Sequence, residues 1–166
     1  ASTVSYLILG NVSLYEKQVS TRLDSPAHIG DFTVDIMDSL GVKDAVDRGR
    51  KTDTIHEGMR FEEILRFMVS SGQQDFPVVD SEGNLEGIIS MTDMREAMAD
   101  TELHNMLVAR DIAIEGVVTV TMDDSLNKAL KLMADLNVRE LPVVDADTGK
   151  KVLSVISRKD ITKTYH

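Results

Sequence analysis

The chain has 166 residues, of which 42% are hydrophobic, and its formal net charge at pH 7 is −10. This hydrophobic content is enough for a packed core, whereas the acidic balance argues against a nucleic-acid partner, which needs clustered Lys and Arg to neutralise phosphates. The absence of cysteine excludes disulfides, thiolate zinc sites and cysteine nucleophiles.

The N-terminal segment is unusual because its first 15 residues carry no charged side chain, and residues 6–9 are strongly apolar. It lacks the basic start and the cleavage site of a signal peptide, and no segment reaches the roughly 20 apolar residues of a membrane span. Two interpretations remain open: a core or interface strand, or the end of a membrane region. A short helix is expected over residues 13–22, followed by a linker with breakers at Ser25, Pro26 and Gly30.

The next part of the chain predicts a strand, a helix, two strands and a second helix. The first strand is expected near residues 52–55, and apolar residues at helical spacing predict an amphipathic helix over 61–68. A buried strand follows at 76–79, then a turn, a strand at 85–89 and a helix that begins at Ser90. Asp80 directly after the buried strand is expected to form the turn.

The remainder repeats this order at an offset of 65 positions up to the turn and 67 positions after it. The equivalent elements are a strand at 117–120, a helix from Leu126, strands at 141–144 and 151–156, and a helix at 158–164. Each copy has only about 55–60 residues, a size at which a separate core is marginal. We therefore expect the copies to share an interface and to fold as one pseudo-symmetric body.

Each copy closes with a Ser-x-x-Asp motif where its last strand meets its last helix: Ser90 with Asp93, and Ser157 with Asp160. A hydroxyl and free backbone N–H groups at a helix start favour an anion, and the Asp can accept hydrogen bonds from the vicinal hydroxyls of a ribose. The structural alternative is that each Ser is an N-cap, worth about 1 kcal/mol, and that each Asp complements the helix dipole.

Together, the [Lys/Arg]-Asp opening, the strand and helix, the Pro-Val-Val-Asp strand and the closing motif resemble the CBS (cystathionine β-synthase) domain, with Ser154 where the family usually has Gly. Two copies resemble the tandem pair called a Bateman module. The resemblance implies an α/β (α+β) fold in which two βαββα units pack through their sheets. It also implies ATP, ADP or AMP as a regulatory ligand, with no required cofactor.

The resemblance also assigns candidate residues. Asp93 and Asp160 would bind ribose, and Arg139 would contact phosphate, with Lys159 adding positive charge, so phosphates are expected nearer the second copy. The complete set of candidate nucleotide-binding residues is Thr54, Ser90, Thr92, Asp93, Thr119, Arg139, Ser157, Arg158 and Asp160. The four His residues are scattered, and no catalytic constellation is present, so neither a metal site nor enzyme activity is expected.

A second resemblance concerns residues 11–19 and 24–28, which look like the exit from the membrane domain of ClC-type chloride channels. It implies that Tyr15 coordinates an ion and that residues 1–41 hold the end of a membrane region, a helix and a linker. CBS units over 42–98 and 107–164 would then regulate a chloride channel or chloride/proton exchanger from the cytoplasmic face of the cell membrane.

In that interpretation the partners are the protein's own membrane transport domain and a second subunit in a homodimer. The alternative is an energy-sensing CBS pair that regulates a soluble enzyme or acts as a stand-alone nucleotide-binding protein. The sequence features that separate the two interpretations lie in the first forty residues.

Overall fold

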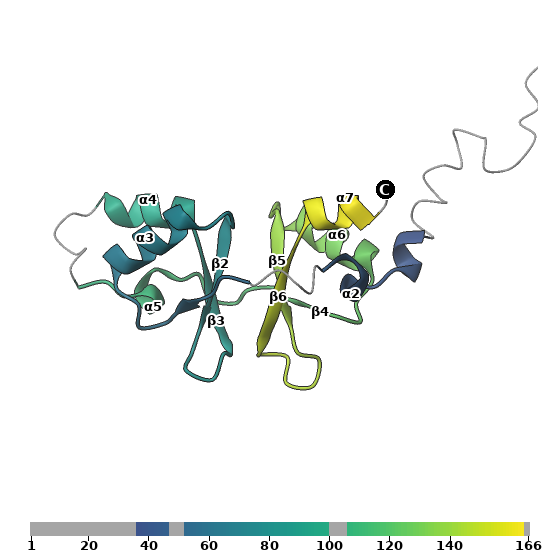
Figure 1. Cartoon of the computed structure of the whole chain (residues 1–166), viewed down its shortest axis with the longest axis horizontal. Coiled ribbons are helices and arrows are strands. Elements are labelled where there is room, and N and C mark those ends of the chain that lie inside the picture. Colours follow the sequence, from purple (N-terminus) through teal and green to yellow (C-terminus); the bar gives the residue numbers. More distant parts are fainter. Residues whose placement is uncertain (1–35, 47–51, 100–105, 165–166) are drawn as a thin grey trace, which may run out of the picture. The chain divides into compact units, whose positions relative to one another are not determined.

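The computed structural model describes residues 36–46, 52–99 and 106–164. The predictions for the N-terminal apolar run, for the helix at 13–22 and for Tyr15 lie outside these residues. From residue 52 onward the order of elements is the predicted one, twice (Figure 1). The α/β fold class of paired βαββα units is therefore confirmed.

The first copy forms a three-stranded sheet in the order β1-β2-β3, with β1 parallel to β2 and β2 antiparallel to β3. Helices α3 and α4 cover one side of this sheet (Figure 1). The elements are β1 (Ile55–His56), α3 (Phe61–Ser70), β2 (Asp75–Val79), β3 (Leu85–Ser90) and α4 (Met91–Met98). Strand β1 is shorter than the predicted strand and starts later.

The second copy has the same topology, in the order β4-β5-β6. Both sheets also carry a register shift at the same place, between Val78 and Val79 and between Val143 and Val144. The elements are β4 (Val120–Thr121), α6 (Leu126–Asp135), β5 (Glu140–Val144), β6 (Val152–Ser157) and α7 (Arg158–Thr164).

Hydrophobic spacing explains how each sheet is covered. In α3, Phe61, Ile64 and Met68 recur at helical intervals, and all three side chains are buried against the sheet. The ring of Phe76 in β2 is fully buried and meets the ring of Phe67 edge to face, with 6.0 Å between ring centroids. Such aromatic pairs add to the stabilisation that burial of apolar area provides.

The opening helix of each copy packs on the other copy (Figure 1). Val42 of α2 (Val42–Ala45) belongs to the core of the second sheet, whereas Ala109 of α5 (Ala109–Ile112) belongs to the core of the first. The backbone bonds are equivalent: Val42 N–H donates to the Asp124 carbonyl at 2.8 Å, and Ala109 N–H donates to the Met59 carbonyl at 2.9 Å.

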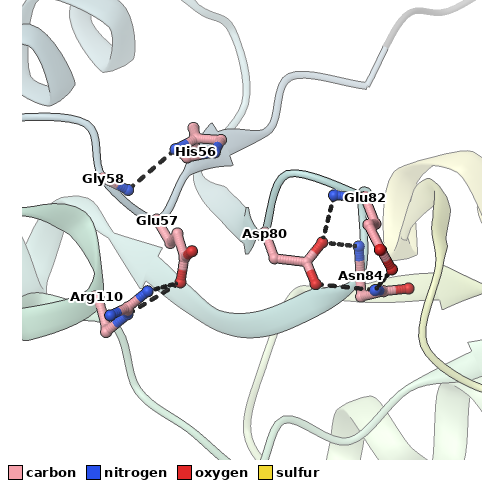
Figure 2. Close-up of polar contacts among 7 residues, drawn as sticks. All are labelled: His56, Glu57, Gly58, Asp80, Glu82, Asn84 and Arg110. Carbon is pink, nitrogen blue, oxygen red and sulfur yellow. Dashed lines mark hydrogen bonds and ion pairs between the residues drawn. The ribbon is translucent and has the colours of Figure 1, made fainter.

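An ion pair supports this helix exchange in the first sheet. Figure 2 shows the guanidinium of Arg110 in α5 directed at the carboxylate of Glu57, which follows β1. This contact raises the pKa of Arg110, first through the hydrogen bond to Glu57 and then through its charge. The predicted boundaries 42–98 and 107–164 thus describe sequence repeats, and each packing unit takes its opening helix from the other repeat.

Asp80 forms the turn after β2, as its position predicts. Its carboxylate accepts hydrogen bonds from the Glu82 N–H at 2.8 Å, the Asn84 N–H at 2.9 Å and the Asn84 side-chain amide at 2.9 Å (Figure 2). The pKa of Asp80 is lowered, chiefly by the side-chain bond from Asn84. Asp145 forms the corresponding turn of the second copy, where the N–H and hydroxyl of Thr148 both donate to its carboxylate at 3.1 Å.

Contacts between equivalent residues reveal the pseudo-twofold axis. Arg139 Nη1 lies 3.4 Å from Gln74 Oε1, and the Asp75 N–H donates to Glu140 Oε2 at 3.4 Å; both pairs are 65 positions apart, which is the repeat offset. A residue can contact its own repeat equivalent only near the axis that relates the copies. The two sheets therefore meet where β2 and β5 begin.

The β2–β3 and β5–β6 hairpins form a second meeting place for the two sheets. The Leu85 N–H donates to the Lys150 carbonyl at 2.8 Å, and the Val152 N–H donates to the Gly83 carbonyl at 3.0 Å. These two bonds are equivalent under the repeat. Val152 lies 67 positions after Leu85, and Lys150 lies 67 positions after Gly83.

Candidate ligand-binding clefts

Two clefts flank the pseudo-twofold axis, one beside each Ser-x-x-Asp motif. The first-copy cleft, of about 570 Å³, lies beside Ser90 and Thr92. The second-copy cleft, of about 620 Å³, lies beside Ser157 and Lys159. Gln73, Gln74 and Arg139 line both clefts, since they lie at or near the axis.

In the first copy, the closing motif is a complete helix cap. The Ser90 hydroxyl and the Ser90 N–H both donate to Asp93 Oδ2 at 2.6 Å, and Ser90 Oγ in turn accepts from the N–H groups of Thr92 and Asp93 at 3.2 and 3.3 Å. Ser90 is therefore an N-cap in the first copy, which is the structural alternative that the sequence analysis named for this motif. Within the described residues, the hydrogen bonds to the Asp93 carboxylate go to Oδ2, so the cap occupies one oxygen of the two.

The second copy repeats this cap. Ser157 donates to Asp160 Oδ2 from its N–H at 3.0 Å and from its hydroxyl at 2.6 Å, and the Asp160 N–H donates back to Ser157 Oγ at 3.1 Å. Ser157 lines the second-copy cleft, whereas Asp160 is not among the residues that line it. The sequence analysis assigned both residues to the nucleotide site, and of the two only Ser157 lines this cleft.

An apolar recess of about 360 Å³ adjoins the first-copy cleft and reaches Asp93. Its apolar walls come from β3, from the chain before β4 and from the start of β5, and they include Ile88, Val117, Val118, Leu141 and Pro142. Apolar walls beside a carboxylate suit an apolar base joined to a ribose. Among the described residues that line the recess, the ionisable ones are all acidic: Asp75, Asp93, Glu115 and Glu140.

One of these carboxyls, that of Asp75, has a shifted pKa. Its pKa is raised, first by burial and then by the nearby charge of Asp93, whereas the charge of Arg139 acts in the opposite direction. Asp75, Gln74 and Glu140 were not among the candidate site residues of the sequence analysis. The available signal was the repeat offset itself, because equivalent residues just before the Pro-Val-Val strand must approach each other if the copies pack about an axis.

The basic residues predicted for phosphate binding have different surroundings. Arg139 is exposed and lines both clefts. Arg158 lines the second-copy cleft but donates from Nη2 to the Met133 carbonyl at 2.8 Å, near the C-terminal end of α6. Part of the Arg158 charge is thus used to cap a helix.

Thr54 and Thr119 are half-buried and do not line the three cavities described above. Their preceding neighbours do: Asp53 lines the second-copy cleft, and Val118 lines the recess of the first. Thr54 and Thr119 directly precede the first strand of their sheet, where the resemblance implies that backbone groups meet the base, and their role stays a prediction.

Two βαββα halves around a pseudo-twofold axis, with a cleft at each closing motif, are the arrangement that the resemblance to a tandem CBS pair implies. The chain belongs to the CBS domain family, whose model matches residues 42–100 and 109–166. A CBS pair is a regulatory module.

The chain matches curated proteins over about two thirds of its own length. The chain is 33% identical over 113 residues to an uncharacterized protein of Methanocaldococcus jannaschii, a match that covers 68% of this chain and 26% of that protein. It is 31% identical over 111 residues to the homoserine O-acetyltransferase of Methanococcus vannielii, covering 67% of this chain and 22% of the enzyme. The chain thus spans about a quarter of the length of these relatives.

Similar solved structures include the CBS domain pair of protein MJ0100 in complex with 5′-methylthioadenosine and S-adenosyl-L-methionine (24% identity, TM-score 0.64, 76% of this chain and 95% of that one). Another is CBSX2 in complex with AMP (22% identity, TM-score 0.65, 75% and 95%). These likenesses show the fold. The ligands of these neighbours agree with the expectation that adenine nucleotides and related adenosine compounds are the regulatory ligands of such pairs.

The predicted location at the cytoplasmic face of a cell membrane is wrong. The chain resembles the relatives named above and, for example, an uncharacterized conserved protein of Pyrococcus horikoshii (21% identity, TM-score 0.69, 84% of this chain and 60% of that one). None of these proteins is named as a ClC-type channel. Within the described residues, no helix combines the length and apolarity needed to cross a bilayer. The channel prediction depended on residues 11–28, which lie outside the described part.

Proposed function

We propose that this CBS pair is an energy-sensing or metabolite-sensing module that binds adenine nucleotides or related adenosine derivatives in its two clefts. The observation that carries the proposal is the apolar recess that opens beside Asp93, at the end of a cleft that also contains Arg139. An apolar slot, a carboxylate and a cation follow one another in the order of a base, a ribose and a phosphate.

The roles follow from this order. In the first-copy cleft the base lies between Val118 and Pro142, and Asp93 accepts hydrogen bonds from the ribose through the oxygen that the helix cap leaves available. Thr92 and Arg139 face the remainder of the ligand. In the second-copy cleft Ser157, Arg158 and Lys159 occupy the equivalent places.

Regulation would arise from a change in the population of two arrangements of the copies. The clefts border the axis where Gln74 meets Arg139, so a ligand that prefers one arrangement of that contact biases the whole pair. A differential affinity of about 1–3 kcal/mol between states is usual for such coupling. The module itself has no catalytic role in this proposal.

The regulated protein is proposed to be an enzyme attached to the pair or a separate partner. Matches to homoserine O-acetyltransferases, in which the chain covers about a fifth of the enzyme, favour this alternative over a chloride channel or exchanger. A homodimer of the CBS pair stays a prediction, and molar mass in solution tests it.

The direct test is calorimetric titration with AMP, ADP and ATP, followed by the same titrations on Asp93→Asn. Asn keeps an oxygen that can accept the cap bonds from Ser90, so the helix start is retained while the carboxylate is lost. The matched control is Asp147→Asn, which removes an equal charge from an exposed position outside the clefts.

We expect micromolar binding to the unmodified chain, at least tenfold weaker binding to Asp93→Asn and no change for Asp147→Asn. Absence of heat with all three nucleotides would contradict the proposal. Equal affinity of Asp93→Asn and the unmodified chain would contradict the assignment of the ribose site.

A further inference from the structure

Equivalent positions in the two clefts hold different types of residue. The second copy contributes apolar side chains to the first-copy cleft and its recess: Val118, Leu136 and Val138. The repeat equivalents of these residues line the second-copy cleft, and they are polar: Asp53, Ser71 and Gln73. The pseudo-twofold axis therefore relates an apolar wall in one cleft to a polar wall in the other.

The polar wall is a connected hydrogen-bond network. The Ser71 hydroxyl donates to Asp53 Oδ2 at 2.6 Å, and the Gln73 N–H donates to Ser71 Oγ at 3.1 Å. The buried side-chain amide of Gln73 donates from Nε2 to the carbonyls of Asp53 and Asp75 at 2.9 and 2.8 Å, and its Oε1 accepts from the Asp53 N–H at 3.3 Å. An apolar surface laid against this wall would remove water from polar groups, which costs free energy.

The apolar wall of the first-copy recess has the opposite property, because part of its surface faces solvent. Ile114, Val118 and Leu136 expose 55%, 37% and 45% of their surface, and all three line the recess. A base that covers these side chains removes apolar area from water, which is favourable in proportion to the area covered. The base of an adenosine ligand is therefore stabilised by the first-copy recess and not by the polar wall of the second-copy cleft.

The charged residues differ in the same sense. Arg139 and Glu140 lie at the axis and line cavities on both sides, so they do not distinguish the clefts. The second-copy cleft adds two cations and one carboxylate: Arg158, Lys159 and Asp53. The first-copy cleft and its recess add one cation and three carboxylates: Arg95, Asp75, Asp93 and Glu115. A chain of several phosphates is thus better matched by the second-copy cleft, whereas Arg95 and Arg139 can still meet a phosphate in the first.

We propose that the two clefts recognise different parts of a nucleotide: the first-copy cleft binds the adenosine part, and the second-copy cleft binds the phosphate chain whatever base it carries. This inference rests on the proposed function, since it specifies the ligand class of the same clefts. Affinity in the second-copy cleft rises with the number of phosphates and is similar for adenine and guanine nucleotides. Affinity in the first-copy cleft depends on the base and the ribose.

The first experiment is calorimetric titration of the unmodified chain with adenosine, tripolyphosphate, ATP and GTP. We expect one adenosine, one tripolyphosphate and two ATP per chain. After saturation with adenosine, GTP and ATP should each bind one equivalent, with affinities within threefold of each other. Two adenosine sites of equal affinity, or displacement of tripolyphosphate by adenosine, would overturn the inference.

The second experiment changes the apolar wall with Leu136→Ser, which places the residue type of the second-copy cleft in the first-copy recess. Adenosine binding should become at least tenfold weaker, and tripolyphosphate binding should stay the same. The matched control is Leu153→Ser, because Leu153 is also 45% exposed and does not line the three described cavities. Unchanged adenosine affinity in Leu136→Ser would refute the role of the apolar wall.

The third experiment changes the cations with Lys159→Thr, which places the residue type of Thr92 in the second-copy cleft. Tripolyphosphate binding should become at least tenfold weaker, and adenosine binding should stay the same. The matched control is Lys163→Thr, which removes an equal charge from an exposed position of the same helix outside the clefts. Equal weakening by both variants would mean that net charge, and not the cleft, attracts the phosphates.

The titrations also separate this inference from the proposed function. Asp93→Asn should weaken the adenosine-dependent step and leave tripolyphosphate binding unchanged, because the two probes occupy different clefts. If adenosine and ATP both bind to two equal sites per chain, the inference is refuted and nucleotide binding stands. If none of the probes binds to the unmodified chain, the proposed function fails, and the inference fails with it. The substituted residues Leu136 and Lys159 are exposed, so normal folding is expected, and thermal unfolding verifies it.

Discussion

The first and second copies of the repeat share their backbone and differ in their clefts. Their sheets have the same strand order, the same register shift and the same Ser-to-Asp helix cap. They differ where Gln74 faces Arg139 and where Thr92 corresponds to Lys159. The comparison teaches that apolar and capping positions maintain the fold, while a few polar positions near the axis determine what each cleft can bind.

The third strand of each sheet provides a second contrast. A Cβ atom added to Gly87 in β3 would lie 2.9 Å from Ala113 Cβ and 2.9 Å from the Ile114 carbonyl oxygen. The segment that follows α5 therefore packs directly on the backbone of β3, where Ile88 and Ile114 exchange N–H donors at 3.0 and 2.9 Å. In β6 the equivalent Ser154 is buried, and its hydroxyl lies 3.3 Å from the Thr52 hydroxyl.

The largest expected effect tests whether the copies share stability. Phe76→Ala in the first core should lower the free energy of unfolding by about 3–5 kcal/mol, and the equivalent Leu141→Ala in the second core by about 2–5 kcal/mol. Because the opening helices are exchanged, each variant should unfold in one transition at a lower temperature. Differential scanning calorimetry provides the measurement, and two separated transitions would show that the halves are independent.

An intermediate effect is expected from interchanging the residues of the third strands. Gly87→Ser should cost about 1–3 kcal/mol, because the new Cβ must displace backbone and a methyl group. The reciprocal Ser154→Gly loses one hydroxyl contact, and glycine loses more backbone freedom on folding than serine does. Together these should cost about 1 kcal/mol. Urea unfolding of both variants tests the contrast. Equal costs would mean that the first sheet accommodates a side chain as readily as the second.

The smallest effect concerns Asp75 and depends on pH. A carboxyl whose folded-state pKa is raised contributes stability below its unfolded value of 3.8, and that contribution is lost as the pH rises through the folded value. Asn has no carboxyl to ionise, so the Asp75→Asn variant does not lose this stability as the pH rises. It should therefore melt at a higher temperature than the unmodified chain at pH 7.

The advantage of Asp75→Asn should disappear as the pH falls toward 4, where Asp75 itself becomes protonated. Melting curves at several pH values follow the difference between the two proteins. Glu82→Gln, at an exposed position in the hairpin, is the control and should show no comparable pH dependence. A variant that is less stable at pH 7 would mean that the attraction between Asp75 and Arg139 outweighs the burial of the carboxyl.

Much of the fold could be predicted from the sequence because hydrophobic periodicity and repetition are local signals. The stripe of Phe61, Ile64 and Met68 predicted both the helix and its buried face. The exchange of opening helices could not be predicted, because the same short apolar pattern fits either core. Periodicity shows which side chains are buried, and it does not show which sheet buries them.

The candidate site was predictable in part for a similar reason. Ser90, Thr92, Ser157 and Arg158 line the clefts because they lie where a strand ends and a helix begins. Arg139 lines both clefts from the position directly before β5. The role of Thr54 and Thr119 stays a prediction, because they immediately precede very short strands and do not line the described cavities. Asp75 and Glu140 become visible only when the axis between the copies is known.

The exchange of α2 and α5 has a consequence for how this region can be divided. A cut between the repeats would yield two fragments, each lacking a helix that completes its own hydrophobic core and carrying one that belongs to the other. Neither fragment should fold well alone, although mixing them could restore both through complementation in trans. A displacement of the polypeptide before α2 would likewise act on the sheet of the second copy, because α2 packs there. A signal can therefore pass between the two ends of this region without crossing the first sheet.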